Sequence, residues 1–214
     1  MKTRCLLALF AILLQAEIVD RVCVSVDRQV ITISAVVERL RVAAFLNSEK
    51  PDLSPASRRR MAERLIEQAL VQREMEISRY ALPGDDDVTE YLQRVRSGLG
   101  MKAEEFAKRL EQYRLTEAAL RENLRVQLAT VRFIDLRFRP GSAVGDGEIE
   151  LHYRETFLPE WQQANPGKAP PEVDDVQEAI EQTLLARKAN ELLGEWLKQA
   201  RAAARVVFIE EAFQ

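Results

Sequence analysis

Apolar residues recur at intervals of three and four positions through two long stretches of the chain, residues 56–138 and 173–204. In the first stretch one such stripe comprises Met61, Leu65, Ala69 and Ile77, and a later one comprises Leu120, Leu124, Leu128 and Val131. This spacing places side chains on one face of an α-helix, and such a face must be buried against another element. The sequence therefore predicts a mainly α fold of packed helices. We expect helices over about 34–45, 56–80, 87–99, 116–138 and 173–204, a short helix that contains Phe106 and Leu110, and another short one around 149–157.

The two ends of the predicted mature chain have a different pattern. Residues 18–26 alternate in polarity and are rich in β-branched residues, which is typical of a strand. A turn at 27–29 and the residues Val30, Ile31 and Thr32 complete a hairpin, and Ser34 is the expected N-cap of the helix that follows. Residues 206–209 form a second β-branched segment. Because an isolated hairpin is marginally stable in water, we expect the N-terminal hairpin and the C-terminal strand to form one small sheet.

Proline and glycine divide the predicted mature chain into three parts. Residues 17–138 would form the hairpin and a helical core, and residues 173–214 would add a long helix and a strand that complete the core. Between them, residues 139–172 contain two Pro- and Gly-containing linkers, 139–147 and 158–172, on either side of the short helix.

The N-terminus has the order of a secretory signal peptide. Lys2 and Arg4 precede the apolar run 5–14, and the small residue Ala16 follows. A ten-residue helix is about 15 Å long, too short for a hydrocarbon core of ~30 Å. We expect residues 1–16 to be cleaved, leaving a protein without stable membrane insertion. A short uncleaved anchor and a buried helix remain alternatives.

Charge and chemistry exclude several function classes. The chain carries a formal charge of −3, and loss of Lys2 and Arg4 makes it more negative, which is unsuited to nucleic acid. The basic run 58–60 precedes glutamates and is interpreted as a solvated helix start. Cleavage would leave Cys23 as the single cysteine, so no intramolecular disulfide can form, and its valine neighbours predict a buried side chain.

No catalytic, cofactor-binding or metal-binding residues are predicted, and the protein is not expected to be an enzyme. His152 is the single histidine, and no convincing Ser-His-Asp or Cys-His arrangement can be built around it. The acidic run 85–87 is interpreted as the start of a helix rather than a metal site. A phosphate-binding loop of the Gly-x-x-x-x-Gly-Lys kind does not occur in the sequence.

The succession of these segments resembles the SurA family of periplasmic chaperones. The resemblance is carried by the hairpin at 18–32, by the helical segments 60–70, 106–110 and 120–128 and the helix from Asp87, and by the closing helix and strand at 176–209. It implies that the N-terminal helices and the C-terminal helix form one module, with parvulin-type prolyl isomerase domains between them. Only fifteen residues separate Phe157 from Val173. We therefore expect the isomerase domain to be missing.

The resemblance implies an ATP-independent periplasmic chaperone that binds unfolded polypeptides such as outer-membrane protein precursors, without a cofactor. Two alternatives remain: a helical envelope protein with one fixed partner, and a degenerate peptidyl-prolyl isomerase. Core and groove residues have the same composition in a single sequence. The client-binding residues, the clients and the oligomeric state are thus not predicted.

Overall fold

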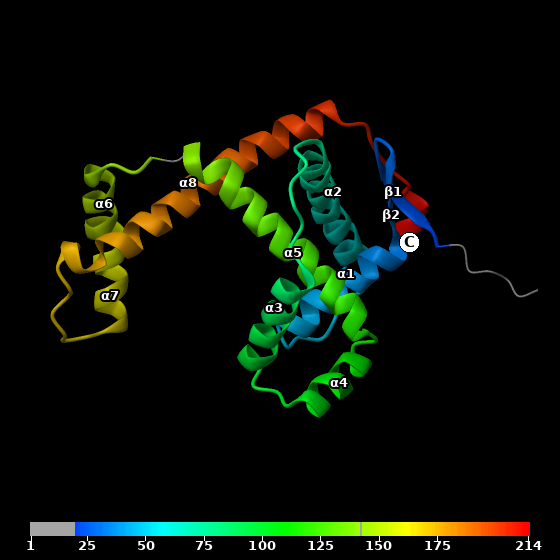
Figure 1. Ribbon diagram of the computed structural model, residues 1–214, viewed down its shortest axis with the longest axis horizontal. Helices are drawn as coiled ribbons and strands as arrows, with labels where there is room; N and C mark the ends of the chain where they lie inside the picture. The colour runs from blue at the N-terminus through cyan, green and yellow to red at the C-terminus, as the bar shows by residue number, and fades with distance from the viewer. Residues whose placement is uncertain (1–19, 142) are drawn as a thin grey trace, which may run out of the picture.

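The computed structural model describes residues 20–141 and 143–214, which form a mainly α structure with one small sheet (Figure 1). The predicted fold class is confirmed. The predicted signal peptide, residues 1–16, lies outside the described residues. Among those that are described, there is no helix with the length and apolar character needed to cross a membrane.

The sheet joins the two ends of the described chain. Its antiparallel strands are β1 (Val22–Val26), β2 (Gln29–Thr32) and β3 (Val206–Phe208), in the order β2-β1-β3. The central strand β1 pairs with β2 across the hairpin and with β3, where Val24 lies opposite Phe208. The prediction that the N-terminal hairpin and the C-terminal strand form one sheet is therefore confirmed.

The first two helices are α1 (Ile33–Leu46) and α2 (Pro55–Ile77), which pack against each other and against the sheet. The N-cap of α1 is Thr32, whose hydroxyl accepts a hydrogen bond from the Ala35 N–H at 3.3 Å. The prediction that Ser34 caps this helix is wrong, because the Ser34 hydroxyl donates instead to Asp20.

A compact group of helices continues from α2. It comprises α3 (Asp85–Gly98), α4 (Ala103–Gln112) and α5 (Glu117–Phe138). Their shared core centres on Phe45 of α1, whose ring makes edge contacts with Phe106 at 5.4 Å between centroids. These three helices confirm the predicted segments.

The middle part of the chain is more helical than predicted. After the 3-10 turn η1 (Arg139–Gly141), α6 (Asp146–His152), the π-helical turn η2 (Tyr153–Phe157) and α7 (Leu158–Ala164) follow one another without a break. The prediction of a linker from residue 158 is therefore wrong as far as Ala164. Pro159 lies within this continuous run and has no N–H to donate to a carbonyl of the preceding turn, which is the π-helical turn η2.

The last helix, α8 (Val173–Ala203), connects three parts of the molecule. It is about 46 Å long at ~1.5 Å per residue. Its first half packs with α6 and η2 through Ile180 and Leu184, its middle contacts α5, and its end reaches the sheet. In Figure 1, α6 and α7 form a lobe that extends away from α1–α5, with α8 as the bridge.

The C-terminal turn η3 (Glu210–Phe213) closes the sheet core, which includes Cys23, fully buried as predicted. Arg59 of α2 holds this turn: its guanidinium lies 3.7 Å from the centre of the Phe208 ring, and its Nη1 donates to Glu210 at 2.6 Å. The interpretation of the run 58–60 as only a solvated helix start is therefore wrong for Arg59. Ile77, predicted on the apolar stripe of α2, is exposed because the helix ends there beyond its partners.

Candidate functional site

An open groove lies between α1, α2, α5 and α8 and has a volume of about 480 Å³. We call it the central groove. Each of the four helices contributes apolar side chains to it, so it forms only when the N-terminal helices and the last helix meet. Its apolar lining comprises Val42, Ala43, Leu46, Met61, Leu65, Val71, Val131, Ile134, Leu193 and Leu197.

Solvent reaches much of this apolar lining. Val131 of α5 keeps 52% of its surface exposed, although it continues the stripe that buries Leu120 and Leu124 nearer the start of the helix. Leu65, Ile134, Leu193 and Leu197 are only half-buried. Apolar surface that a folded chain leaves open in a concavity is typical of a site for an apolar ligand or partner.

Polar side chains border the groove, and two of them are guanidinium groups. Arg39 of α1 is half-buried, and its Nη2 donates to Oε1 of Gln68 on α2 at 2.5 Å. Burial lowers the pKa of Arg39 below its ordinary value, but a guanidinium stays charged at neutral pH. Arg64 and Glu67 of α2 are exposed at the same groove.

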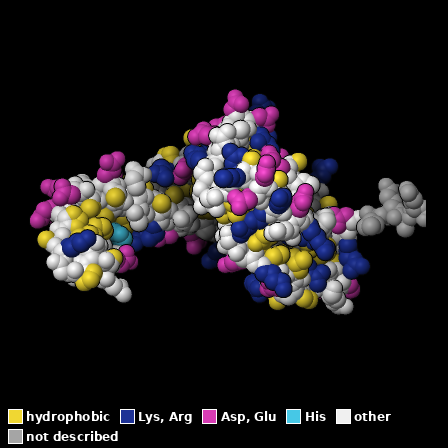
Figure 2. Space-filling view, turned by 90° about the horizontal axis from the view of Figure 1, so that it is seen from below, with side chains coloured by type: hydrophobic (Ala, Val, Ile, Leu, Met, Phe, Trp, Pro, Cys, Tyr) yellow, Lys and Arg dark blue, Asp and Glu magenta, His cyan; other side chains and the backbone are white. Residues whose placement is uncertain are grey.

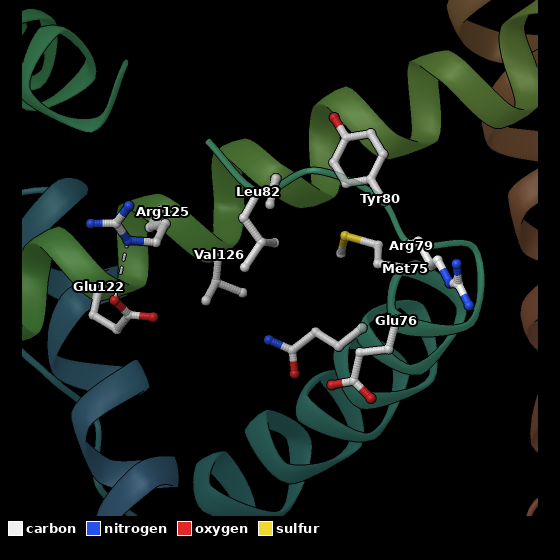
Figure 3. Close-up of a pocket in the computed structure, with 10 residues that line it drawn as sticks. Met75, Glu76, Arg79, Tyr80, Leu82, Glu122, Arg125 and Val126 are labelled. Carbon is white, nitrogen blue, oxygen red and sulfur yellow. Dashed lines mark ion pairs between the residues drawn. The ribbon is translucent and has the colours of Figure 1, made fainter. Parts of the chain in front are cut away.

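A second, smaller pocket of about 280 Å³ lies between the C-terminal half of α2, α5 and the segment that joins α2 to α3 (Figure 3). Met75, Leu82 and Val126 lie on its walls in Figure 3. At its charged border Arg125 contacts Glu122 at 3.4 Å and, outside the pocket, Asp85 at 2.6 Å. This pocket shares no lining residue with the central groove.

Hydrophobic side chains also reach the surface elsewhere. Figure 2 shows them in patches between basic and acidic side chains, both on the main body and on the lobe of α6 and α7. His152 lies on this lobe, at a shallow pocket of about 130 Å³ that Glu155 and Arg187 also line. Thr156 also lines that pocket.

The acidic run 85–87 begins α3, as predicted. Asp87 accepts a hydrogen bond from the Gly84 N–H at 3.0 Å and pairs with Arg132 at 2.7 Å, and these contacts, led by the one to Arg132, lower its pKa. A hydrogen bond from Arg125 lowers the pKa of Asp85 in the same way. Across residues 20–141 and 143–214, no group of three or more His, Cys, Asp or Glu side chains is placed to hold a metal ion.

The apolar periodicity predicts the helices of the central groove, but it does not predict that their side chains line a site. Leu65 and Val131 were assigned to apolar stripes, and nothing in a single sequence separates such residues from core residues. Arg39 carried a weak signal, since it is a charged residue between the apolar Leu40 and Val37 positions of α1. Its neighbour across the groove, Gln68, is 29 residues away in the chain.

Comparison with known proteins leaves the family open. No protein-family model matches the chain, and a search of curated proteins gives no significant match.

Proposed function

We propose that this protein is an ATP-independent chaperone of the SurA type, secreted to the periplasm, which binds unfolded polypeptides in its central groove. Outer-membrane protein precursors are the proposed clients. The proposal includes cleavage of residues 1–16 and the absence of a parvulin domain, and it assigns no catalytic activity or cofactor to the chain.

The observation that carries the proposal is the exposed apolar lining of the central groove. Leu65, Val131 and Leu197 come from three helices and face one concavity that stays open to solvent. A folded chain gains by covering apolar surface, so a groove of this kind favours an apolar segment from another molecule.

The strength of such binding suits a chaperone that works without nucleotide. A client segment that buries ~200 Å² of apolar surface gains about 5 kcal/mol at ~25 cal/mol/Å². This gross gain is comparable with the low end of association costs, ~4–15 kcal/mol. Single contacts should therefore be weak and exchange readily, and the client can leave without ATP hydrolysis.

The topology is consistent with the resemblance on which the family proposal rests. β1 and β3 pair across nearly the whole described chain, so the two ends of the chain belong to one module. The middle segment, where the family would have a parvulin domain, contains only α6, η2 and α7 before the start of α8. A Pro-containing connection follows α7, at 165–172.

Two assays on the purified mature protein test the proposal together. It should suppress aggregation of a denatured outer-membrane-type protein at near-stoichiometric ratio. It should leave the cis/trans relaxation of a proline test peptide at its uncatalysed rate, because lowering a barrier of ~18–20 kcal/mol requires a shaped site for the twisted imide.

A matched pair of variants on α5 connects the activity to the groove. Val131→Asn places an amide in the groove, whereas Leu136→Asn makes the same kind of change at a residue that is 65% exposed and does not line it. Loss of one apolar contact of about 1.5 kcal/mol should weaken client binding roughly tenfold in the first variant. The second should bind as the unaltered protein does.

The results also separate the alternatives. Clear catalysis on the proline peptide would establish a degenerate isomerase. Failure to suppress aggregation at several-fold excess would favour a protein with one fixed partner, and a stoichiometric complex isolated from the cell envelope would then identify it. Equal binding by both α5 variants would place the clients outside the central groove.

A further inference from the structure

The border of the central groove carries more positive than negative charge. Its lining includes two arginines, Arg39 and Arg64, and a single carboxylate, Glu67. The chain as a whole has the opposite balance, with 31 basic and 34 acidic residues. The groove is thus a local cationic site on an acidic protein, and such a site favours a ligand of opposite charge.

Both guanidinium groups retain unused donors. Within the described part of the chain, neither Arg39 nor Arg64 forms an ion pair with a carboxylate, in contrast to Arg59 and Arg125, each of which forms two. The hydrogen bond of Arg39 goes to the neutral Gln68, and the adjacent Glu38 accepts from Asn123 at 2.9 Å. A guanidinium has five N–H donors, so Arg39 can bind a further acceptor.

We propose that the central groove selects apolar client segments that carry an aspartate or glutamate side chain, which Arg39 and Arg64 bind while the flanking apolar residues cover Leu65 and Val131. This inference rests on the proposed chaperone function and names the client chemistry. An arginine fork matches the two oxygens of a carboxylate, and such charge-assisted hydrogen bonds are stronger than neutral ones. The partial burial of Arg39 reduces competition from water.

The proposed occupant presents an internal side chain rather than a chain end. The groove is open to solvent and its lining comes from four helices, so we propose an extended segment that lies along it. A carboxylate in the middle of the segment then reaches the arginines while apolar residues on both sides stay in contact with the lining.

The test uses three end-blocked fluorescent peptides with apolar flanks and Asp, Asn or Lys at the central position, titrated with the mature protein. Blocking removes the terminal charges. We expect the Asp peptide to bind about tenfold more tightly than the Asn peptide, which equals ~1.4 kcal/mol, and the Lys peptide to bind most weakly. Salt at about 0.5 M should reduce the Asp preference, since it screens the exposed part of the interaction.

Variants assign the preference to the two side chains. Arg64→Gln changes an exposed residue and should reduce the Asp preference severalfold without altering the thermal melt. Arg39→Gln should reduce it further, and Arg28→Gln, at an exposed position in the hairpin turn away from the groove, should retain it. Binding of the Asn peptide should be nearly the same in all variants.

Equal binding of the Asp and Asn peptides by the unaltered protein would overturn the inference while leaving the chaperone function intact. The same conclusion would follow if the Asp preference survived both groove substitutions. If the aggregation assay failed as well and no peptide bound, the proposed function itself would be wrong.

Discussion

The C-terminal turn offers the most direct test of how this fold is stabilised, through the substitution Phe213→Ala. Phe213 keeps only 5% of its surface exposed and belongs to the core formed by the sheet, α1 and α2. Its ring lies 6.3 Å from that of Phe208, and the Arg59 guanidinium lies 5.4 Å from its centre. Removing the ring would leave a cavity beneath β3 and would remove one of the two aromatic rings that the Arg59 guanidinium contacts.

The size of the effect follows from cavity formation. A buried Phe→Ala change costs about 3–5 kcal/mol, a large part of the ~5–15 kcal/mol that holds a typical domain together. For a chain of 150–250 residues, each kcal/mol shifts the melting temperature by ~2–4 °C. The expected decrease for Phe213→Ala is therefore about 6–20 °C. Deletion of residues 205–214, which removes β3 as well, should lower the melting temperature further or abolish cooperative unfolding.

Thermal unfolding followed by far-UV circular dichroism measures this directly. Glu211→Ala provides the matched control, because Glu211 belongs to the same turn and is exposed, so its change should stay within about ±0.5 kcal/mol. If Phe213→Ala melts within two or three degrees of the unaltered protein, packing of the C-terminal turn against the sheet core does not stabilise the fold.

Two further predictions concern pH and processing. Hydrogen bonds from the Ser57 hydroxyl, followed by those from Ser54, lower the pKa of Asp52 to about 2. Because the folded value lies below the unfolded value of 3.8, Asp52 stabilises the fold above pH 3.8 and this contribution is lost as the pH falls toward 2. Asp52→Asn should therefore weaken the pH dependence of the melting temperature over that interval, and an unchanged acid limb would contradict the assignment. Mature protein isolated from the cell envelope should begin near Glu17, and N-terminal sequencing that finds Met1 in membrane-bound material would refute cleavage.

The mature N-terminus and the client chemistry remain proposals, but the secondary structure was largely predictable. The apolar periodicity located α2, α5 and α8, and the β-branched segments located the strands at both ends. Cys23 was correctly expected to be buried, because its valine neighbours leave little other role for a small apolar side chain. The failures were local, since Ser34 and Thr32 are both suitable caps and only the bond between Ser34 and Asp20 decides between them.

The prolines predict a linker at residues where the structure has α7. A proline normally interrupts a helix, but Pro159 follows the π-helical turn η2 directly and the helix continues through it. Whether a proline lies in a linker or in a helix depends on the backbone conformation of the residues before it. Here η2 continues directly into α7, and that continuity is not visible in composition.

The apolar periodicity predicts which face of each helix is apolar, and the β-branched segments predict that the two ends of the described chain pair in one sheet. Which of those apolar faces is covered depends on how the helices pack. Leu120 and Val131 lie on the same helix, yet one is buried by α1, α3 and α4 while the other borders the central groove. Periodicity shows that one face of a helix is apolar. The exposure of that face depends on whether another part of the chain packs against it.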